Sequence, residues 1–546
     1  MNKYLLSTIL AFAVSLPSCD YLDYSESSGY GKEDMFVYFD RAKGMLTTAY
    51  SYLPVDFGSF DGATRAAATD EAEYAWSTSN IIRYNNGSWS PILTIDDVWG
   101  NYYAAIRTTN MFLENHQKDF ENIEWNDDYA LLMKQYQYYP YEARFLRAFY
   151  YFELAKRYKN VPLITDCLEL EDANKVAPAD FEKVMGFIVS ECNEIADKLP
   201  VSYKDMPGAE TGRITQGAVM ALKSRVLLYA ASPLYAGAVS QEKWVEAAKA
   251  AKQLIDKSES EGWYQLVDES SWNNLSSKEL ILETRQGNSN NFEKLNFPIG
   301  YEGGNSGTCP SQNLVDAFEM SDGSRFDWKN PEHVSNIYNP EKRDSRLFKT
   351  VLYNGSTFKN ATVETFIGGK NGTPIDGATP TGYYLKKYVL ESISLDPNNT
   401  TTGRHVWVLF RYAEVLLNYA EALYEAYGNP DYTDNTFTLS PRAAIDQVRT
   451  RAGMPGVATD NFRERIRNER QVELAFEDHR FWDVRRWKIA DQTMDIYGVK
   501  IEKKGNDLIY TRQLVDQRTW NDRMYLYPIS NAELFKNTLL NQNPDW

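Results

Sequence analysis

Apolar side chains recur at the 3.6-residue spacing of an α-helix through the first 258 residues, and this periodicity restricts the fold more than any other feature. A stripe of this kind gives each helix one face to bury, so successive helices must pack against one another. The stripes run from Phe36 to Leu53, Val98 to Leu113, Tyr141 to Phe152, Phe181 to Leu199 and Trp244 to Leu254. The pattern predicts a helical N-terminal part.

Two of the expected helices form a pair, from Thr215 to Tyr235 and from Glu242 to Ile255. The short turn between them, residues 236–240, forces the two helices to run antiparallel. Small alanines alternate with large aromatic residues at this spacing, which resembles tetratricopeptide-type helix pairs, although no clean 34-residue period is present.

The periodicity is lost from about residue 260 to 403, where Gly, Asn, Ser, Thr and Pro dominate. These residues predict long loops with short strands, and long loops inside a compact chain are usually functional. Helix returns from Leu409 to Tyr427, and Ser440-Pro441 begins another helix that Gly453 ends. We therefore predict a mostly α fold with a large loop-rich insert. Its single domain, residues 19–546, is expected to hold a helical N-terminal part at about 35–258, the insert at 259–403, and a helical C-terminal part with a closing tail at 404–546.

The charge balance excludes several classes of partner. The 546 residues hold 58 Lys+Arg against 75 Asp+Glu, a formal net charge of −17. Such a surface repels phosphate backbones and anionic headgroups, so we expect no nucleic-acid binding and no electrostatic membrane binding. Aromatic residues make up 14% of the chain, and Tyr leads them. Either these rings pack the helices, or some of them are exposed to bind a ligand.

Residues 1–18 have the pattern of an export signal, with Lys3 before an apolar run from Leu5 to Leu16. The run is too short to span a bilayer, and no later apolar run reaches about 18 residues. Leu16-Pro17-Ser18-Cys19 resembles a bacterial lipobox, in which the cysteine is lipidated and becomes the new N-terminus. The alternative is an ordinary signal with a chance cysteine. Several acyl chains on Cys19 would anchor the protein stably.

The remaining cysteines, Cys167, Cys192 and Cys309, are too few for a disulfide framework and leave open one bridge, such as Cys167–Cys192. No CxxC motif is present and the four histidines are far apart, so we expect no zinc site.

Catalytic motifs are missing from the sequence. Ile367-Gly-Gly-Lys-Asn-Gly372 lacks the spacing and the Ser/Thr of a P-loop, and neither HExxH nor GxSxG occurs. Glu469, Glu473 and Glu477 recur at i+4 among several arginines. Paired carboxylates can serve as acid and base, but these more simply form an ion-pair network that fixes the helix. We expect no enzyme activity and no cofactor.

Several sequence blocks, spread over most of the chain, together resemble the SusD/RagB family of surface-exposed outer-membrane lipoproteins of Bacteroidetes. No single block is specific, but their order is. They are the lipobox, Trp99-Gly-Asn-Tyr-Tyr-Ala-Ala-Ile-Arg107 with Asn110, Glu142 to Ala155, Val161 to Ile164, Pro310 to Met320 with Asp322-Gly323, Arg411 to Ala422, Glu469 to Trp487, and Tyr527-Pro528 through Gln542-Asn-Pro-Asp-Trp546. Asp545 stands where the family usually has Gly.

The resemblance implies a tetratricopeptide-containing α fold without catalysis. It also implies capture of a glycan at the cell surface, on a SusC-type TonB-dependent transporter, although some members take peptides or other nutrients. It places the ligand site in the loops before the helix at Val98 and in the mid-chain insert, without fixing its positions.

Two stretches outside the helix stripes combine aromatic residues with Asp, Asn and Arg, as a sugar site requires. One spans residues 70–89, and the other is the insert around Asn290, Asn291, Tyr301, Asn305 and Trp328. An open alternative is that these aromatic residues are buried in loops. Trp99, Trp482 and Trp487 lie in shared motifs and are expected in the core. Our candidates are Trp76, Trp89 and Tyr301 for stacking, and Asp70, Arg83 and Asn305 for hydrogen bonds.

Two other functions compete with glycan capture. Acidic residues near aromatic ones would suit a glycoside hydrolase, which would turn over the glycan that it binds. A pure scaffold would bind only the transporter through its helices.

Overall fold

The computed structural model describes residues 34–117, 119–169, 171–204, 206, 208, 210–268 and 272–546; the predicted signal and Cys19 lie outside this part of the chain. The longer helices are α3 (Phe39–Tyr50), α5 (Trp99–Asn115), α6 (Tyr129–Tyr136), α7 (Tyr139–Tyr158), α8 (Phe181–Ile195), α9 (Gln216–Ala231), α11 (Gln241–Glu261), α16 (Tyr412–Tyr427), α17 (Pro441–Arg451) and α18 (Phe462–Glu473). Shorter helices are α2 (Asp34–Val37), α4 (Ile82–Asn86), α10 (Pro233–Ala236), α12 (Asn291–Asn296), α13 (Gln312–Ala317), α14 (Pro331–Ser335), α15 (Leu347–Thr350), α19 (Arg480–Arg486) and α20 (Asn531–Lys536).

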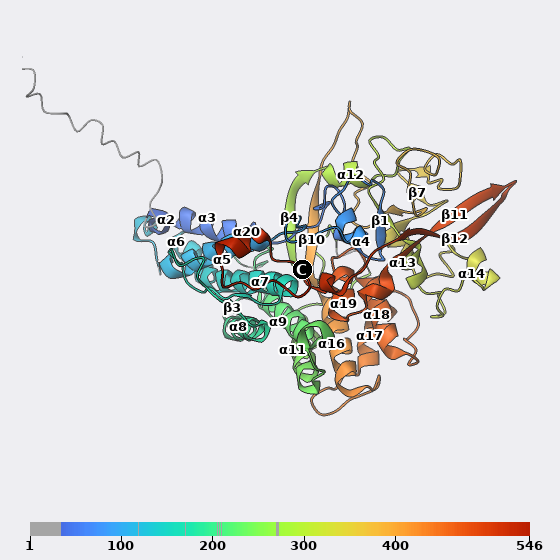
Figure 1. Cartoon of the computed structure of the whole chain (residues 1–546). Helices are drawn as coiled ribbons and strands as arrows, with labels where there is room; N and C mark the ends of the chain where they lie inside the picture. The colour runs from blue at the N-terminus through green and yellow to red at the C-terminus, as the bar shows by residue number, and fades with distance from the viewer. Residues whose placement is uncertain are drawn as a thin grey trace, which may run out of the picture.

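The long helices pack as neighbouring pairs, which confirms the predicted tetratricopeptide-like arrangement. Helix α5 packs on α7, α7 on α8, α9 on α11, and α11 on α16 (Figure 1). The predicted pair at 215–255 is present, but its first helix is interrupted: α9 ends at Ala231, and Pro233 begins α10. Proline cannot donate the backbone hydrogen bond that would continue α9.

Every sheet among the described residues has two antiparallel strands. Four of the pairs are short and bring distant loops together: β1 (Ala72–Tyr74) with β5 (Thr308–Pro310), β2 (Val161–Pro162) with β3 (Pro178–Ala179), β6 (Val351–Leu352) with β9 (Tyr384–Leu385), and β7 (Thr357–Phe358) with β8 (Ala361–Thr362). The other two are long, β4 (Leu280–Ser289) with β10 (Gly403–Arg411) and β11 (Asp495–Lys504) with β12 (Asp507–Gln517). The loop-rich insert with short strands is therefore confirmed, whereas its exact boundaries stay a prediction.

Two sequence predictions about the C-terminal part are wrong. Leu409 lies in strand β10, because the β-branched and aromatic run before Tyr412 favours a strand. Residues 495–517, expected to be helix and tail, form a hairpin that extends away from the body (Figure 1). Its two-residue turn, Gly505-Asn506, has a positive φ at Gly505 and is a typical hairpin signal.

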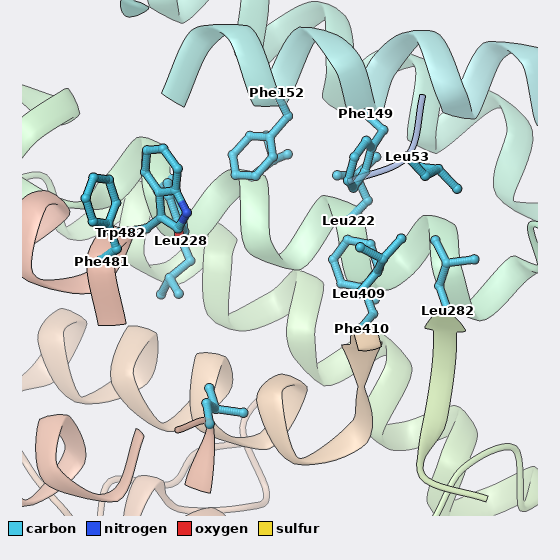
Figure 2. Packing of buried hydrophobic residues seen from close by; sticks show 14 of the residues in the cluster. Leu53, Phe149, Phe152, Leu222, Leu228, Leu282, Leu409, Phe410, Phe481 and Trp482 are labelled. Atoms are coloured by element: carbon cyan, nitrogen blue, oxygen red, sulfur yellow. The ribbon is translucent and has the colours of Figure 1, made fainter. Parts of the chain in front are cut away.

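The core lies where the helices meet the β4–β10 sheet. Figure 2 shows Phe149 and Phe152 of α7 directed toward α9, with Leu222 of α9 and Phe410 of β10 close to Phe149. All of these side chains are buried, as are Trp99, Trp482 and Trp487, so the core assignment of those three tryptophans is confirmed.

The acidic residues of the 469–487 segment form a buried ion-pair network, as predicted. Arg411 is at its centre: Nη1 donates to Glu279 at 2.6 Å and to Glu473 at 2.7 Å, and Nε donates to Glu477 at 2.6 Å. The other cations of this network are Arg346, Arg449, Arg451 and Lys387.

Cys192 and Cys309 are buried thiols. The Cys167–Cys192 disulfide, which the sequence left open, is therefore not formed.

Candidate functional site

The structure brings two of the predicted ligand-binding residues, Trp76 and Asn305, into direct contact. Strand β1 pairs with β5, so the loop that follows Tyr74 lies beside the loop that precedes Thr308. The Trp76 Nε1–H donates to the backbone carbonyl of Asn305 at 2.7 Å. The indole is therefore held by its edge, and its ring stays partly exposed.

A third loop supports the same indole. At Gly377, which has a φ of +72°, an added Cβ would lie 2.6 Å from the Trp76 ring. Only glycine allows this close approach, because a side chain would collide with the ring and the backbone conformation would be strained. Ser306 donates a hydrogen bond to the carbonyl of Gly377. The indole is thus a flat surface that three loops hold in place. Gly377 was not among the predicted site residues; its only sequence signal was the glycine-rich composition of residues 354–380.

Tyr301 belongs to the same turn as Asn305, but its ring packs inward. Its hydroxyl donates to the carbonyl of Ala361 at 3.1 Å, and its ring meets Phe358 edge-on with centroids 5.0 Å apart. Partial burial raises the pKa of the Tyr301 hydroxyl. The side-chain amide of Asn305 makes no hydrogen bond within the described residues, so it is available to a ligand.

Asp70 and Trp89 lie in structural positions instead. Asp70 is buried and accepts two hydrogen bonds from Arg480, at 2.8 and 2.7 Å. Trp89 is 1% exposed, and its ring is covered by other aromatic rings, so it has no face for a sugar. The prediction of a stacking role for Trp89 is therefore wrong in this fold, and the buried-loop alternative applies. Arg83 lies partly exposed on α4.

Glu71, next to Asp70, is a buried carboxyl group. It is 1% exposed, and its Oε1 has no hydrogen-bond partner within the described part of the chain. Burial raises its pKa to about 8, which the positive charge of Arg480 only partly opposes. The group therefore stays largely protonated near neutral pH.

This pKa predicts a pH-dependent stability. The folded chain binds the Glu71 proton more tightly than the unfolded chain, whose pKa is near 4.5, so the free energy of unfolding falls as pH rises from about 4.5 to about 8. In Glu71→Gln we expect the free energy of unfolding to fall less over this pH range than in the wild type, by an amount on the order of 3 kcal/mol. Urea unfolding at pH 4.5 and at pH 8 measures the difference. Glu246→Gln, at an exposed site, is the control and should keep the wild-type slope. Equal slopes in Glu71→Gln and wild type would contradict the raised pKa.

Neither a metal site nor a membrane span emerges from the described residues. No group of three or more His, Cys, Asp or Glu side chains in this part of the chain is placed to hold a metal ion. In the same part, no helix has the length and apolar composition needed to cross a bilayer.

Structural comparison shows a shared fold. A SusD-like protein of Bacteroides fragilis superposes with a TM-score of 0.76 at 28% identity, covering 94% of this chain and 98% of that one. A SusD-like carbohydrate-binding protein of the same species gives a TM-score of 0.73 at 26% identity, covering 93% and 100%. A laminarin-binding SusD-like protein, at 21% identity, has a TM-score of 0.63 and shares the fold over 93% of this chain and 99% of its own.

Sequence comparison gives the same family. SusD-like protein P25 of Formosa agariphila is 22% identical over 419 residues, which is 73% of this chain and 71% of that protein. The sequence model of a family described as starch-binding and associating with the outer membrane matches residues 20–228. The SusD family model matches residues 274–546, half of the chain. The chain belongs to the SusD family.

Proposed function

We propose that this protein is a cell-surface glycan-binding lipoprotein that captures an oligosaccharide and delivers it to a SusC-like TonB-dependent transporter in the outer membrane. The observation that carries the proposal is the Trp76 indole, a partly exposed flat ring fixed by Asn305 and Gly377. Such a ring can cover the apolar C–H face of a sugar, while the Asn305 amide bonds its hydroxyl groups.

The family supports binding over catalysis. Relatives that share the fold include a carbohydrate-binding and a laminarin-binding protein. The acidic residues that would suit a hydrolase, Glu469, Glu473 and Glu477, are all buried in ion pairs. We therefore propose capture without turnover. Peptide or other nutrient capture in the same role is the alternative, and a pure scaffold would show no small ligand.

The proposed location is the outer membrane, with the anchor on Cys19. The description of the N-terminal family match, starch-binding and associating with the outer membrane, supports it. The lipobox at residues 16–19 supplies the site of attachment.

Replacing Trp76 by alanine tests the proposal. Because the indole supplies the stacking surface, we expect Trp76→Ala to raise the Kd for the bound oligosaccharide about tenfold or more, measured by calorimetric titration of the hits from a glycan array. Trp263→Ala is the matched control, because Trp263 is also half-buried and also donates one hydrogen bond through Nε1, to Glu261. No saturable binding to any glycan, or equal Kd values for both variants, would contradict the proposal.

A further inference from the structure

A cleft of about 480 Å³ lies beside the C-terminal turn of α3, and none of the six predicted ligand-binding residues lines it. Residues 51–56, Ser59 and the start of α5 line it, together with Trp407 and Asp478. The cleft therefore joins the segment matched by the N-terminal family model to the segment matched by the C-terminal one. It adjoins a wider cleft of about 800 Å³ along α3 and β4, with which it shares Ser51, Leu53 and Val55.

Arg65 and Arg157, the two cationic side chains that line the smaller cleft, are already paired with carboxylates. Arg65 donates to Asp96 at 2.8 Å and to Asp478 at 2.6 Å, and Arg157 pairs with Asp96 at 3.0 Å. The carboxylate of Asp56 accepts from the backbone N–H of Arg65 at 2.6 Å. An ionic ligand would have to compete with these pairs, whereas a neutral one would not.

The adjoining cleft is balanced in the same way. Arg213 pairs with Glu142 and Glu210, and Arg285 pairs with Glu283. Every arginine that lines the two clefts is thus already paired with a carboxylate, so neither cleft offers a free arginine to an anionic ligand.

Several polar groups of the smaller cleft keep hydrogen-bonding capacity. The Oδ1 of Asp96, the side-chain amide of Asn101 and the hydroxyl of Tyr52 have no hydrogen-bond partner among the residues that the structure describes. A carboxylate oxygen accepts from a hydroxyl group, and an amide both donates and accepts. The half-exposed ring of Tyr52 adds an apolar surface beside them. This combination suits a neutral ligand that carries many hydroxyl groups.

We propose that this cleft is a second glycan site, which takes one or more sugar rings of a neutral oligosaccharide independently of Trp76. Its volume lies in the range of small-ligand pockets, about 300–1,000 Å³. Asp96 and Asn101 bind the hydroxyl groups, and Tyr52 covers a C–H face. Two sites on one chain hold a long glycan more tightly than either site alone.

Calorimetric titration with maltohexaose and laminarihexaose tests the second site. Asn101 is exposed on α5 and lines the cleft, so Asn101→Trp fills the space without disturbing the core. We expect Trp76→Ala to keep saturable binding of at least one hexasaccharide, and the added Asn101→Trp change to raise that remaining Kd about tenfold or more. Thr108→Trp, two turns further along α5 and outside both clefts, is the matched control and should leave the Kd unchanged.

The outcomes separate this site from the Trp76 site. If Trp76→Ala abolishes all binding, or if Asn101→Trp leaves the remaining Kd unchanged, the second site is overturned and the Trp76 site stands. If Trp76→Ala has no effect but Asn101→Trp removes binding, the second site holds and the Trp76 site fails. Wild-type protein that binds neither hexasaccharide overturns the second site. Asn101→Ala, which removes the amide without adding bulk, should weaken the same binding and guards against misfolding of the tryptophan variant.

Discussion

Replacing Arg411 by methionine is expected to lower the free energy of unfolding by about 4 kcal/mol, the largest effect of any single charge removal that we foresee. The guanidinium of Arg411 is buried and lies between Glu279, Glu473 and Glu477. Burial alone would raise the pKa of Glu473, but Arg451 and Arg411 hold it well below its ordinary value. Without Arg411, these carboxylates would remain buried with too little positive charge.

The loss is measured by urea unfolding of the purified protein, with Arg463→Met as the matched control. Arg463 also makes a two-point contact with a carboxylate, Glu425, but its side chain is 54% exposed. Solvent screens such a pair, so the control should change the unfolding free energy by less than about 1 kcal/mol. If Arg411→Met also changed the free energy of unfolding by less than about 1 kcal/mol, the ion-pair network around Arg411 would contribute little to stability.

Trp89→Ala is expected to cost about 4 kcal/mol of stability through loss of packing, not through loss of ligand contact. The ring of Trp89 packs edge-on against Tyr84, Tyr527 and Trp546, with centroids 5.0, 5.2 and 4.7 Å away. Removing the indole leaves a cavity at the point where the N-terminal loops meet the end of the chain. If this variant binds glycan more weakly, we expect the cause to be its lower stability and not the loss of a contact between Trp89 and the ligand.

Thermal and urea unfolding check this expectation, and Trp125→Ala serves as the control because Trp125 is 78% exposed. The control should unfold like the wild type. A Trp89→Ala protein that is as stable as the wild type but binds glycan weakly would restore Trp89 as a ligand contact and contradict its assignment to the core.

The helices were predictable because each one's period is local in the sequence. The stripe from Trp244 to Leu254 matches the buried face of α11, and Ser440 caps α17 as expected, accepting from the backbone N–H of Ala443. The hairpin at 495–517 also carries a local sequence signal, Gly505-Asn506 between alternating residues.

The candidate site was only partly predictable, because its contacts join distant positions. Asp70 has the polar side chain that a sugar site needs, yet its partner Arg480 comes 410 residues later. Trp76 and Trp89 have the same chemistry in the sequence, and only the pairing of β1 with β5 and the packing of Trp546 distinguish an exposed ring from a buried one. No local pattern carries that information.

The packing around Trp89 also determines when the chain can finish folding. Tyr84 donates to the hydroxyl of Tyr527 at 2.6 Å, and Tyr527 donates to Asp96 at 3.1 Å. Contacts with such long sequence separation form late, because the intervening chain must first be ordered. The loops of residues 70–96 therefore reach their final packing only after residues 527–546 have been synthesised, so the half-made chain cannot yet complete the fold around Trp89.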